Sequence, residues 1–221
     1  MQFTLSKSII SIMNALILLF YRIVTIFTRA RTKQMPYLQG FDDKIFSAEG
    51  GFINDQSSLY EIPYGKGNMA DNGCGPIALY NAILFLCNTD ASKDKFLEII
   101  SYLEKTGAAF RGKLGTAPQA IRKFLNKNGF TTKSFFSKNS VRLDKFSEQF
   151  DAFISIIFND SKHISKGLHF IFIKKNTDGS FTAHNPLMNG ESLYKTLDNC
   201  SCAEIRHVCT IGIKRNTEQH N

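Results

Sequence analysis

The sequence predicts an α+β protein in which helices come first and antiparallel strands follow. Between residues 75 and 129, long apolar segments begin and end at helix-capping residues. After residue 150, short β-branched and aromatic runs replace them, and an Asp-Gly turn at 178–179 joins two of these runs at hairpin spacing. Because helices and strands are segregated rather than alternating, we do not expect a doubly wound fold.

The first expected helix covers residues 9–27, a run of 19 residues in which Arg22 carries the one charge. This length suits a membrane-spanning helix of about 20 apolar residues, so we expect a membrane anchor. The bases that follow it, Arg29, Arg31 and Lys33, favour a cytoplasmic position for the rest of the chain. A signal peptide, and hence a secreted form, is an alternative, although no small-residue cleavage site follows the run. A buried globular helix is the third interpretation.

We expect three parts in the chain. Residues 1–33 form the anchor helix with its basic flank. Residues 34–67 are rich in Gly, Asp, Ser, Pro and Tyr, which is typical of an irregular lead-in with short extended pieces. Residues 68–221 form one folded domain, a size that suits a single core.

Four further helices are expected in that domain. Gly75-Pro76 opens a helix through 77–87 that is apolar nearly all round, which predicts a helix buried in the centre. The other three begin at Ala91, at Thr116 as N-cap with Pro118 in the first turn, and at Leu143; they end near Glu104, Asn128-Gly129 and Phe150. The expected strands are 153–158, 168–173, 181–184 and 207–214.

Net charge and cysteine usage exclude several partners. The chain has 27 Lys+Arg against 19 Asp+Glu and a formal charge of +8, but residues 1–40 hold five of the bases and no acid. The rest is nearly balanced, so nucleic-acid binding is not expected. The five cysteines cannot all pair within one chain, and their spacing fits no zinc site. We therefore expect a free thiol and no metal.

The sharpest local feature is Asp71-Asn72-Gly73-Cys74-Gly75-Pro76, directly before the central helix. It places Cys74 at a helix N-terminus, where the macrodipole and free N–H groups are expected to lower the thiol pKa. The same N–H groups can form half of an oxyanion hole, and the flanking glycines allow a substrate backbone to approach. The structural alternative is a capped helix with a small buried cysteine.

A thiol nucleophile needs a base, and His169 is the best candidate among the five histidines. It opens an otherwise apolar strand, and Asn185 follows the hairpin partner of that strand. Antiparallel pairing brings the two together, as when an amide orients a catalytic imidazole. His184 is one residue off and points to the opposite sheet face. The structural alternative for His169 is a surface residue at a strand end.

Four stretches, in this order, make the chain resemble the papain-like cysteine peptidases, and most closely the branch of the bacterial bacteriocin-leader (double-glycine) peptidases. They are Asn72 to Pro76, Gly115 to Phe130, the strand Ile154–Phe158, and His169 to Ile173 with Asn185-Pro186. The resemblance covers residues 68–186. It implies a papain-like fold, with a central helix starting at the nucleophile and helices packed on a C-terminal antiparallel sheet.

The same resemblance implies a peptidase without metal or organic cofactor, acting on a peptide or protein substrate such as a leader peptide. Cys74 would be the nucleophile, His169 the general base and acid, and Asn185 the orienting residue. Leader peptidases usually have Asp-Pro at that last position, so Asn185-Pro186 departs toward the papain form. The family's oxyanion Gln, six residues before the cysteine, is replaced by Asn68, and Asn72 is the other candidate for that role.

Two other functions fit the same residues. A papain-like fold can carry out acyl or amide transfer on a non-protein amide. A degenerate member could also serve as a membrane-tethered binding domain without catalysis.

Overall fold

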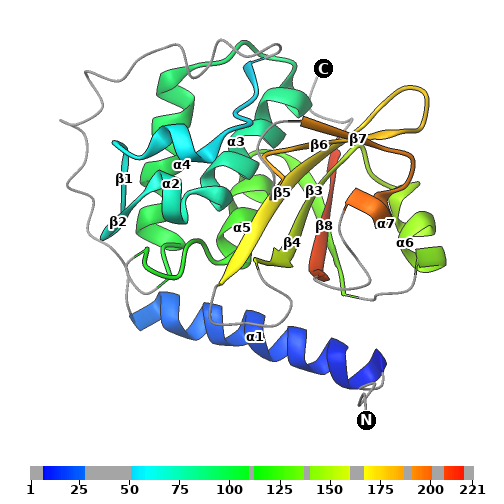
Figure 1. The fold of residues 1–221 in the computed structure, drawn as a ribbon, viewed down its shortest axis with the longest axis horizontal. Coiled ribbons are helices and arrows are strands. Elements are labelled where there is room, and N and C mark those ends of the chain that lie inside the picture. The colour runs from blue at the N-terminus through cyan, green and yellow to red at the C-terminus, as the bar shows by residue number, and fades with distance from the viewer. Residues whose placement is uncertain are drawn as a thin grey trace.

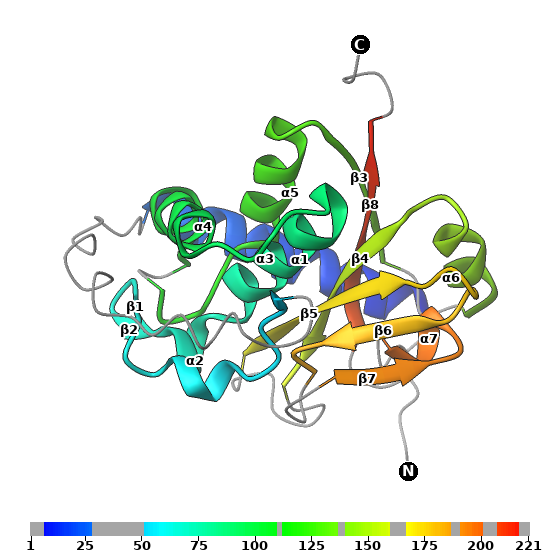
Figure 2. The same ribbon diagram turned by 90° about the horizontal axis from the view of Figure 1, so that it is seen from above.

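The computed structural model describes residues 7–27, 51–109, 112–136, 140–159, 167–186, 191–200 and 207–216. Three helices lie on one side of an antiparallel sheet, and two short helices cover the other face (Figures 1 and 2). The α+β class predicted from the sequence is confirmed. So is the position of the central helix, which begins at the cysteine and packs on the sheet.

The helices on the first face are α3 (Cys74–Cys87), α4 (Lys93–Thr106) and α5 (Pro118–Lys127), and those on the second are α6 (Ser140–Ser147) and α7 (Leu197–Cys200). Twelve of the fourteen residues of α3 are buried, as its apolar character predicts. Before α3, the chain forms a short 3-10 helix η4 (Gln56–Leu59), the hairpin β1 (Pro63–Tyr64) and β2 (Gly67–Asn68), and helix α2 (Met69–Asn72). The side chains of Ile53, Leu59, Ile62 and Tyr64 are buried in the same core as α3. The residues from 51 on are thus part of the folded unit.

The main sheet has the strand order β3-β8-β4-β5-β6-β7, and every neighbouring pair is antiparallel. Its strands are β3 (Phe130–Phe135), β4 (Ala152–Phe158), β5 (Leu168–Lys175), β6 (Phe181–His184), β7 (Glu191–Tyr194) and β8 (His207–Arg215). Successive side chains of a strand point to opposite faces, and here both faces are covered by helices. That is why the central strands are apolar throughout instead of alternating.

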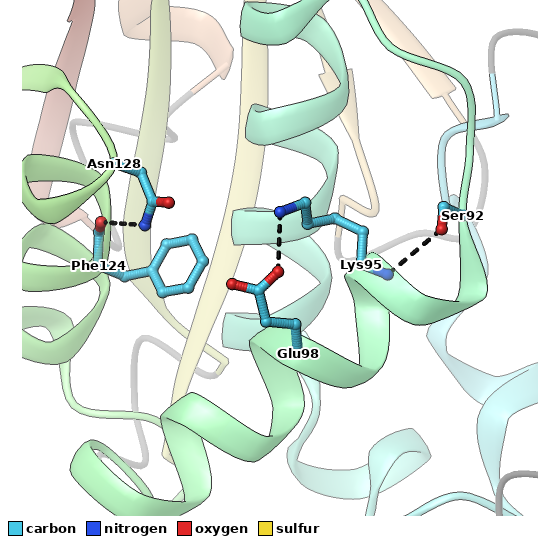
Figure 3. A network of polar contacts seen from close by, with 5 residues as sticks. All are labelled: Ser92, Lys95, Glu98, Phe124 and Asn128. Atoms are coloured by element: carbon cyan, nitrogen blue, oxygen red, sulfur yellow. Dashed lines mark hydrogen bonds and ion pairs between the residues drawn. The ribbon is translucent and has the colours of Figure 1, made fainter.

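Local capping explains where the outer helices begin and end (Figure 3). The Ser92 hydroxyl accepts a hydrogen bond from the Lys95 N–H at 3.4 Å and caps α4. One turn later, the Lys95 ammonium lies 2.8 Å from the Glu98 carboxylate, an exposed pair that adds little stability. At the end of α5, the Asn128 amide donates to the Phe124 carbonyl at 2.8 Å, which satisfies an otherwise open helix end.

Three sequence predictions need correction. Strand β3 lies between α5 and α6, so the helices are not all completed before the sheet begins. Strands β3 and β7 were not predicted, because FTTKSF and ESLY carry too many polar residues to stand out. Thr116 is not the N-cap of α5. Ala117 occupies that position, while the Thr116 hydroxyl bonds the Tyr64 hydroxyl at 2.7 Å inside the core.

The hydrophobic helix predicted over residues 9–27 is α1, which spans Lys7–Phe27 and packs on the domain (Figure 1). The Asn14 amide donates to the carbonyls of His207 and Val208 in β8, at 3.3 and 3.1 Å. The Gln119 amide of α5 donates to the Leu18 carbonyl at 2.6 Å. Among the described residues, no helix combines the length and the apolar character needed to cross a bilayer.

Candidate active site

Cys74 is the first residue of α3, and the backbone around it is closely packed. A Cβ atom added to Gly73 would lie 2.4 Å from the Met69 carbonyl oxygen. A Cβ atom added to Gly75 would lie 2.5 Å from the side chain of Thr116. Both glycines are therefore needed so that the helix can begin against α2 and the loop before α5. From the sequence, these glycines were expected to allow a substrate backbone to approach. On these two sides the atoms that lie close to them belong to the protein itself.

The Cys74 thiol lies beside the start of β5. Its Sγ–H donates to the Leu168 carbonyl at 3.7 Å, and the residue is 5% exposed. Strand β6 pairs with β5 from Phe172 onward, so the first residues of β5 are free of β6. The topology thus brings the N-terminus of the central helix to the open start of a sheet strand.

Burial, not the helix dipole, decides the protonation of Cys74. Burial raises the pKa of the thiol to about 11, although the backbone N–H groups of Phe170, Gly75 and Cys74 itself act in the lowering direction. The lowered thiol pKa predicted from the helix N-terminus is therefore wrong for this structure, in which the sulfur is buried. The N–H groups are present as expected, but desolvation of the sulfur outweighs them, so Cys74 is a neutral thiol at pH 7.

His169 lies in the same cleft as Cys74, is 9% exposed and is held by one short hydrogen bond. Its Nε2–H donates to the main-chain carbonyl of Asn185 at 2.8 Å. Because a carbonyl can accept but not donate, this bond places the proton of the neutral ring on Nε2 and leaves the lone pair on Nδ1. Burial lowers the pKa of His169, and the Asn185 carbonyl opposes that shift. The ring is thus a neutral base at pH 7.

Asn185 is beside His169, as the hairpin argument predicts, but the contact differs from the predicted one. The residue has a positive φ of 56°, a left-handed conformation that turns its carbonyl toward the imidazole. Its side-chain amide points elsewhere and donates to Gln56 Oε1 at 3.2 Å. The orienting group in this structure is the backbone of Asn185, and its side chain serves to hold that backbone.

Gln56 is a site residue that the sequence pattern missed. It lies on η4, and its Nε2–H donates to the Ala70 carbonyl at 2.7 Å while its oxygen accepts from Asn185. A single glutamine connects α2, directly before the nucleophile, with the end of β6. Gln56 lies 18 residues before Cys74, in a segment without hydrophobic periodicity. The only signal in the sequence was therefore the presence of a Gln upstream of the cysteine.

The two residues predicted to stabilise an oxyanion do not line the cleft. Asn68 is the N-cap of α2. Its oxygen accepts from the Asp71 N–H at 2.8 Å, and its amide donates to the Asp71 carboxylate at 2.9 Å. The Asn72 side-chain amide lies close to Gly67 of β2. Neither residue is among those that line the cleft around Cys74.

The cleft has a volume of about 310 Å³ and is open to solvent. It is lined by Gln56, Ser57, Ala70, Asp71, Cys74, Asn159, Leu168, His169, Asn185 and Pro186. Leu168 also belongs to an apolar cluster in which Ile17 and Tyr21 of α1 pack on Ala109 and Ala117. Burial raises the pKa of Tyr21 to about 12, and the proximity of Cys74 adds to that rise. Helix α1 therefore lies next to the site.

The other described histidines have structural positions. His184 is buried, stacks on Phe52 with ring centroids 4.2 Å apart, and contacts the Asn54 side chain at 2.9 Å through Nδ1. It lies on the sheet face opposite to the one that carries Ala183, as strand alternation predicts. His207 bonds Thr210 within β8. In the described part of the chain, no three His, Cys, Asp or Glu side chains gather where a metal could be held.

Comparison with known proteins gives a likeness among solved structures and none among sequences. Neither a protein-family model nor a curated protein matches the sequence. Among solved structures, the chain is similar to the peptidase domain of Streptococcus ComA, a bifunctional ABC transporter involved in a quorum-sensing pathway. The TM-score is 0.43 and the identity 17%, over 65% of this chain and 91% of that domain.

Proposed function

We propose that the protein is a cysteine peptidase that hydrolyses a peptide bond, with Cys74 as nucleophile and His169 as general base and acid. One observation carries the proposal: a single cleft is lined by both side chains, and the imidazole is held by its Nε2–H so that Nδ1 is the basic atom. The resemblance of the motif order to the leader-peptide branch of papain-like peptidases suggests a peptide substrate of that class.

The two reacting groups form a neutral pair at pH 7. Burial raises the pKa of Cys74 and lowers that of His169, so both shifts oppose a preformed thiolate–imidazolium pair. The proton of Sγ–H then passes to His169 Nδ1 as the sulfur forms its bond to the peptide carbonyl carbon. Substrate binding would exclude water from the cleft. The charges that the site must stabilise, on the carbonyl oxygen and on the imidazole, would then form during the reaction.

The main-chain N–H groups at the start of α3 would hold the developing oxyanion. The first N–H groups of a helix have no partner within the helix, and those of Cys74 and Gly75 already face the sulfur. His169 next gives its new proton to the leaving amine as the C–N bond breaks. A water molecule then attacks the thioester, losing a proton to His169, which returns that proton to the sulfur as the carboxylic product leaves.

Gln56 and Asn185 would act as positioning residues. The path from the Ala70 carbonyl through Gln56 to the Asn185 amide fixes the left-handed turn after β6. That turn aims the Asn185 carbonyl at His169 Nε2. The chain would thus use the amide pair of Gln56 and Asn185 to set the tautomer that a papain-type asparagine sets with its own side chain.

The proposal is tested with a complex peptide library, since the substrate is unidentified. The full-length protein is incubated with the library, and new peptide termini are read by mass spectrometry. We expect a recurring set of cleavages that Cys74→Ala abolishes and His169→Gln reduces by a factor on the order of a hundred or more. Cys87→Ser, at the exposed far end of the same helix, is the matched control and should cleave like the wild type.

Three outcomes would overturn the proposal. Cleavage that persists in Cys74→Ala would exclude this nucleophile. New termini that form with the wild type only when an acceptor amine is supplied would favour transfer over hydrolysis. Peptides retained by the protein without any cleavage would favour the non-catalytic binding domain.

A further inference from the structure

Helix α1 has two apolar faces, and the domain covers one of them. Asn14, Leu18 and Tyr21 are 2%, 7% and 6% exposed and lie against the domain. The opposite face carries six large apolar side chains that are 39–60% exposed: Ile12, Met13, Leu16, Leu19, Phe20 and Ile23. Their three- and four-residue spacing places them on one continuous stripe, which we call the outer stripe of α1.

The outer stripe is too concentrated to be ordinary surface. Apolar side chains scattered singly are normal on a soluble protein, and Tyr60 and Leu193 are examples here. Six of the nine large exposed apolar side chains described for this chain lie on three turns of one helix. A contiguous patch of that kind marks an interaction surface.

Charge identifies the kind of partner. Residues 1–40 contain Lys7, Arg22, Arg29, Arg31 and Lys33 and no acid. Arg22 is exposed and, at helical spacing, lies at the border of the outer stripe, where its stem can follow the apolar surface and its head can reach a polar layer. An apolar stripe with a base at its border, in a segment that carries five bases and no acid, is the pattern of a helix that lies in the surface of an anionic bilayer.

We propose that the outer stripe of α1 docks the protein on anionic lipid, with the helix in the plane of the interface and not across the bilayer. The inner face supports this orientation because its hydrogen bonds from Asn14 to β8 and from Gln119 to Leu18 tie the helix to the domain. A second copy of the chain is a poorer occupant. It would bring two segments of charge +5 together, and like charges across an interface are unfavourable.

Docking in this way would bring the cleft to the membrane surface. Ile17 and Tyr21 of α1 pack with Leu168, whose carbonyl accepts the hydrogen bond of Cys74. A peptide that arrives along the lipid would therefore reach the cleft over a short path. The lipid proposal itself does not depend on the peptidase proposal, since it concerns the other side of α1.

The test is co-sedimentation of the full chain with vesicles, with a lipid-free tube as reference. Vesicles of phosphatidylcholine alone are compared with vesicles that also contain phosphatidylglycerol, at low and at high salt. We expect binding to the anionic vesicles that weakens with salt. Leu16→Gln with Phe20→Gln should lower the partition coefficient by about tenfold or more, because two of the inserted side chains become polar. The matched control Tyr60→Gln with Leu193→Gln should bind like the wild type.

Three results would overturn the proposal. One is equal binding by the outer-stripe variant and the wild type. Another is binding that does not depend on phosphatidylglycerol. The third is light scattering that shows a wild-type dimer which Leu16→Gln with Phe20→Gln converts to a monomer, since the occupant would then be a second copy. Circular dichroism of each variant establishes that the fold is retained.

Discussion

The main-chain carbonyl of Asn185 bonds His169, whereas its side-chain amide bonds Gln56. Two substitutions distinguish the roles of these two groups. In Asn185→Gly the left-handed φ of 56° costs no steric strain, and the carbonyl that accepts from His169 remains. The variant loses the hydrogen bond to Gln56, which contributes about 1 kcal/mol. In Asn185→Ala the same bond is lost and the left-handed conformation costs about 1–2 kcal/mol more. Alanine should therefore destabilise the fold by about 2–3 kcal/mol in total.

Equilibrium urea unfolding and library cleavage measure the two effects. The greater entropy of the unfolded glycine variant reduces its advantage over the alanine variant by about 0.4–1 kcal/mol, so we expect Asn185→Gly to be the more stable of the two by up to about 1.6 kcal/mol. Its cleavage rate should stay within about tenfold of the wild type, because the imidazole keeps its carbonyl partner. A rate that falls to the level of Cys74→Ala would show that the side chain orients His169 and would refute the main-chain role.

Three further perturbations follow from the same contacts. Gly75→Ala should cost about 1–3 kcal/mol in urea unfolding, because its Cβ atom would lie 2.5 Å from buried Thr116. Gly179→Ala, with φ of 83° and open space around it, should cost about 1–2 kcal/mol from backbone strain alone. A Gly75→Ala variant as stable as the wild type would contradict the close packing. Burial, and then the charge of Lys174, lower the pKa of His184 from its ordinary 6.5 to about 3, so the unfolded chain takes up this proton first and stability should fall as pH decreases from 6.5 toward 3. His184→Gln should flatten that part of the stability profile, and an unchanged slope would remove His184 as its source. Gln56→Ala should lower the cleavage rate more than Asn68→Ala does, because Gln56 lines the cleft and Asn68 caps α2; the reverse order would restore Asn68 as an oxyanion residue.

The elements that could be predicted from the sequence are those in which local and tertiary preferences agree. Helix α3 was expected over 77–87 and is found over Cys74–Cys87, since an apolar run opened by Gly75-Pro76 has few other stable conformations. Thr116 shows the opposite case. Its hydroxyl is a good N-cap group, but in the structure it bonds the buried Tyr64 hydroxyl instead of the first turn of α5. Strand β3 was missed because β8 pairs along its whole length without requiring an apolar pattern.

The site was predictable in composition but not in its contacts. The hairpin between His169 and Asn185 was enough to place these two residues together, and the resemblance to papain-like peptidases added Cys74 to them. The contact through the Asn185 carbonyl depends on one backbone angle that no residue type specifies. The pKa of Cys74 depends on how fully segments distant in the sequence bury the sulfur, and Gln56 reaches the site from a segment without periodicity. Such features arise from packing between distant segments.

The attack of Cys74 on a peptide carbonyl is tested most directly by trapping the acyl group that it would carry. A peptide that the wild type cleaves is mixed with the protein, the reaction is quenched in acid, and the modified residue is located by mass spectrometry. We predict a thioester on Cys74 in the wild type and none in His169→Gln, where the thiol keeps its proton. Cleavage of the peptide with an acyl group on Cys87, or with the same products from Cys74→Ala, would contradict the proposed chemistry.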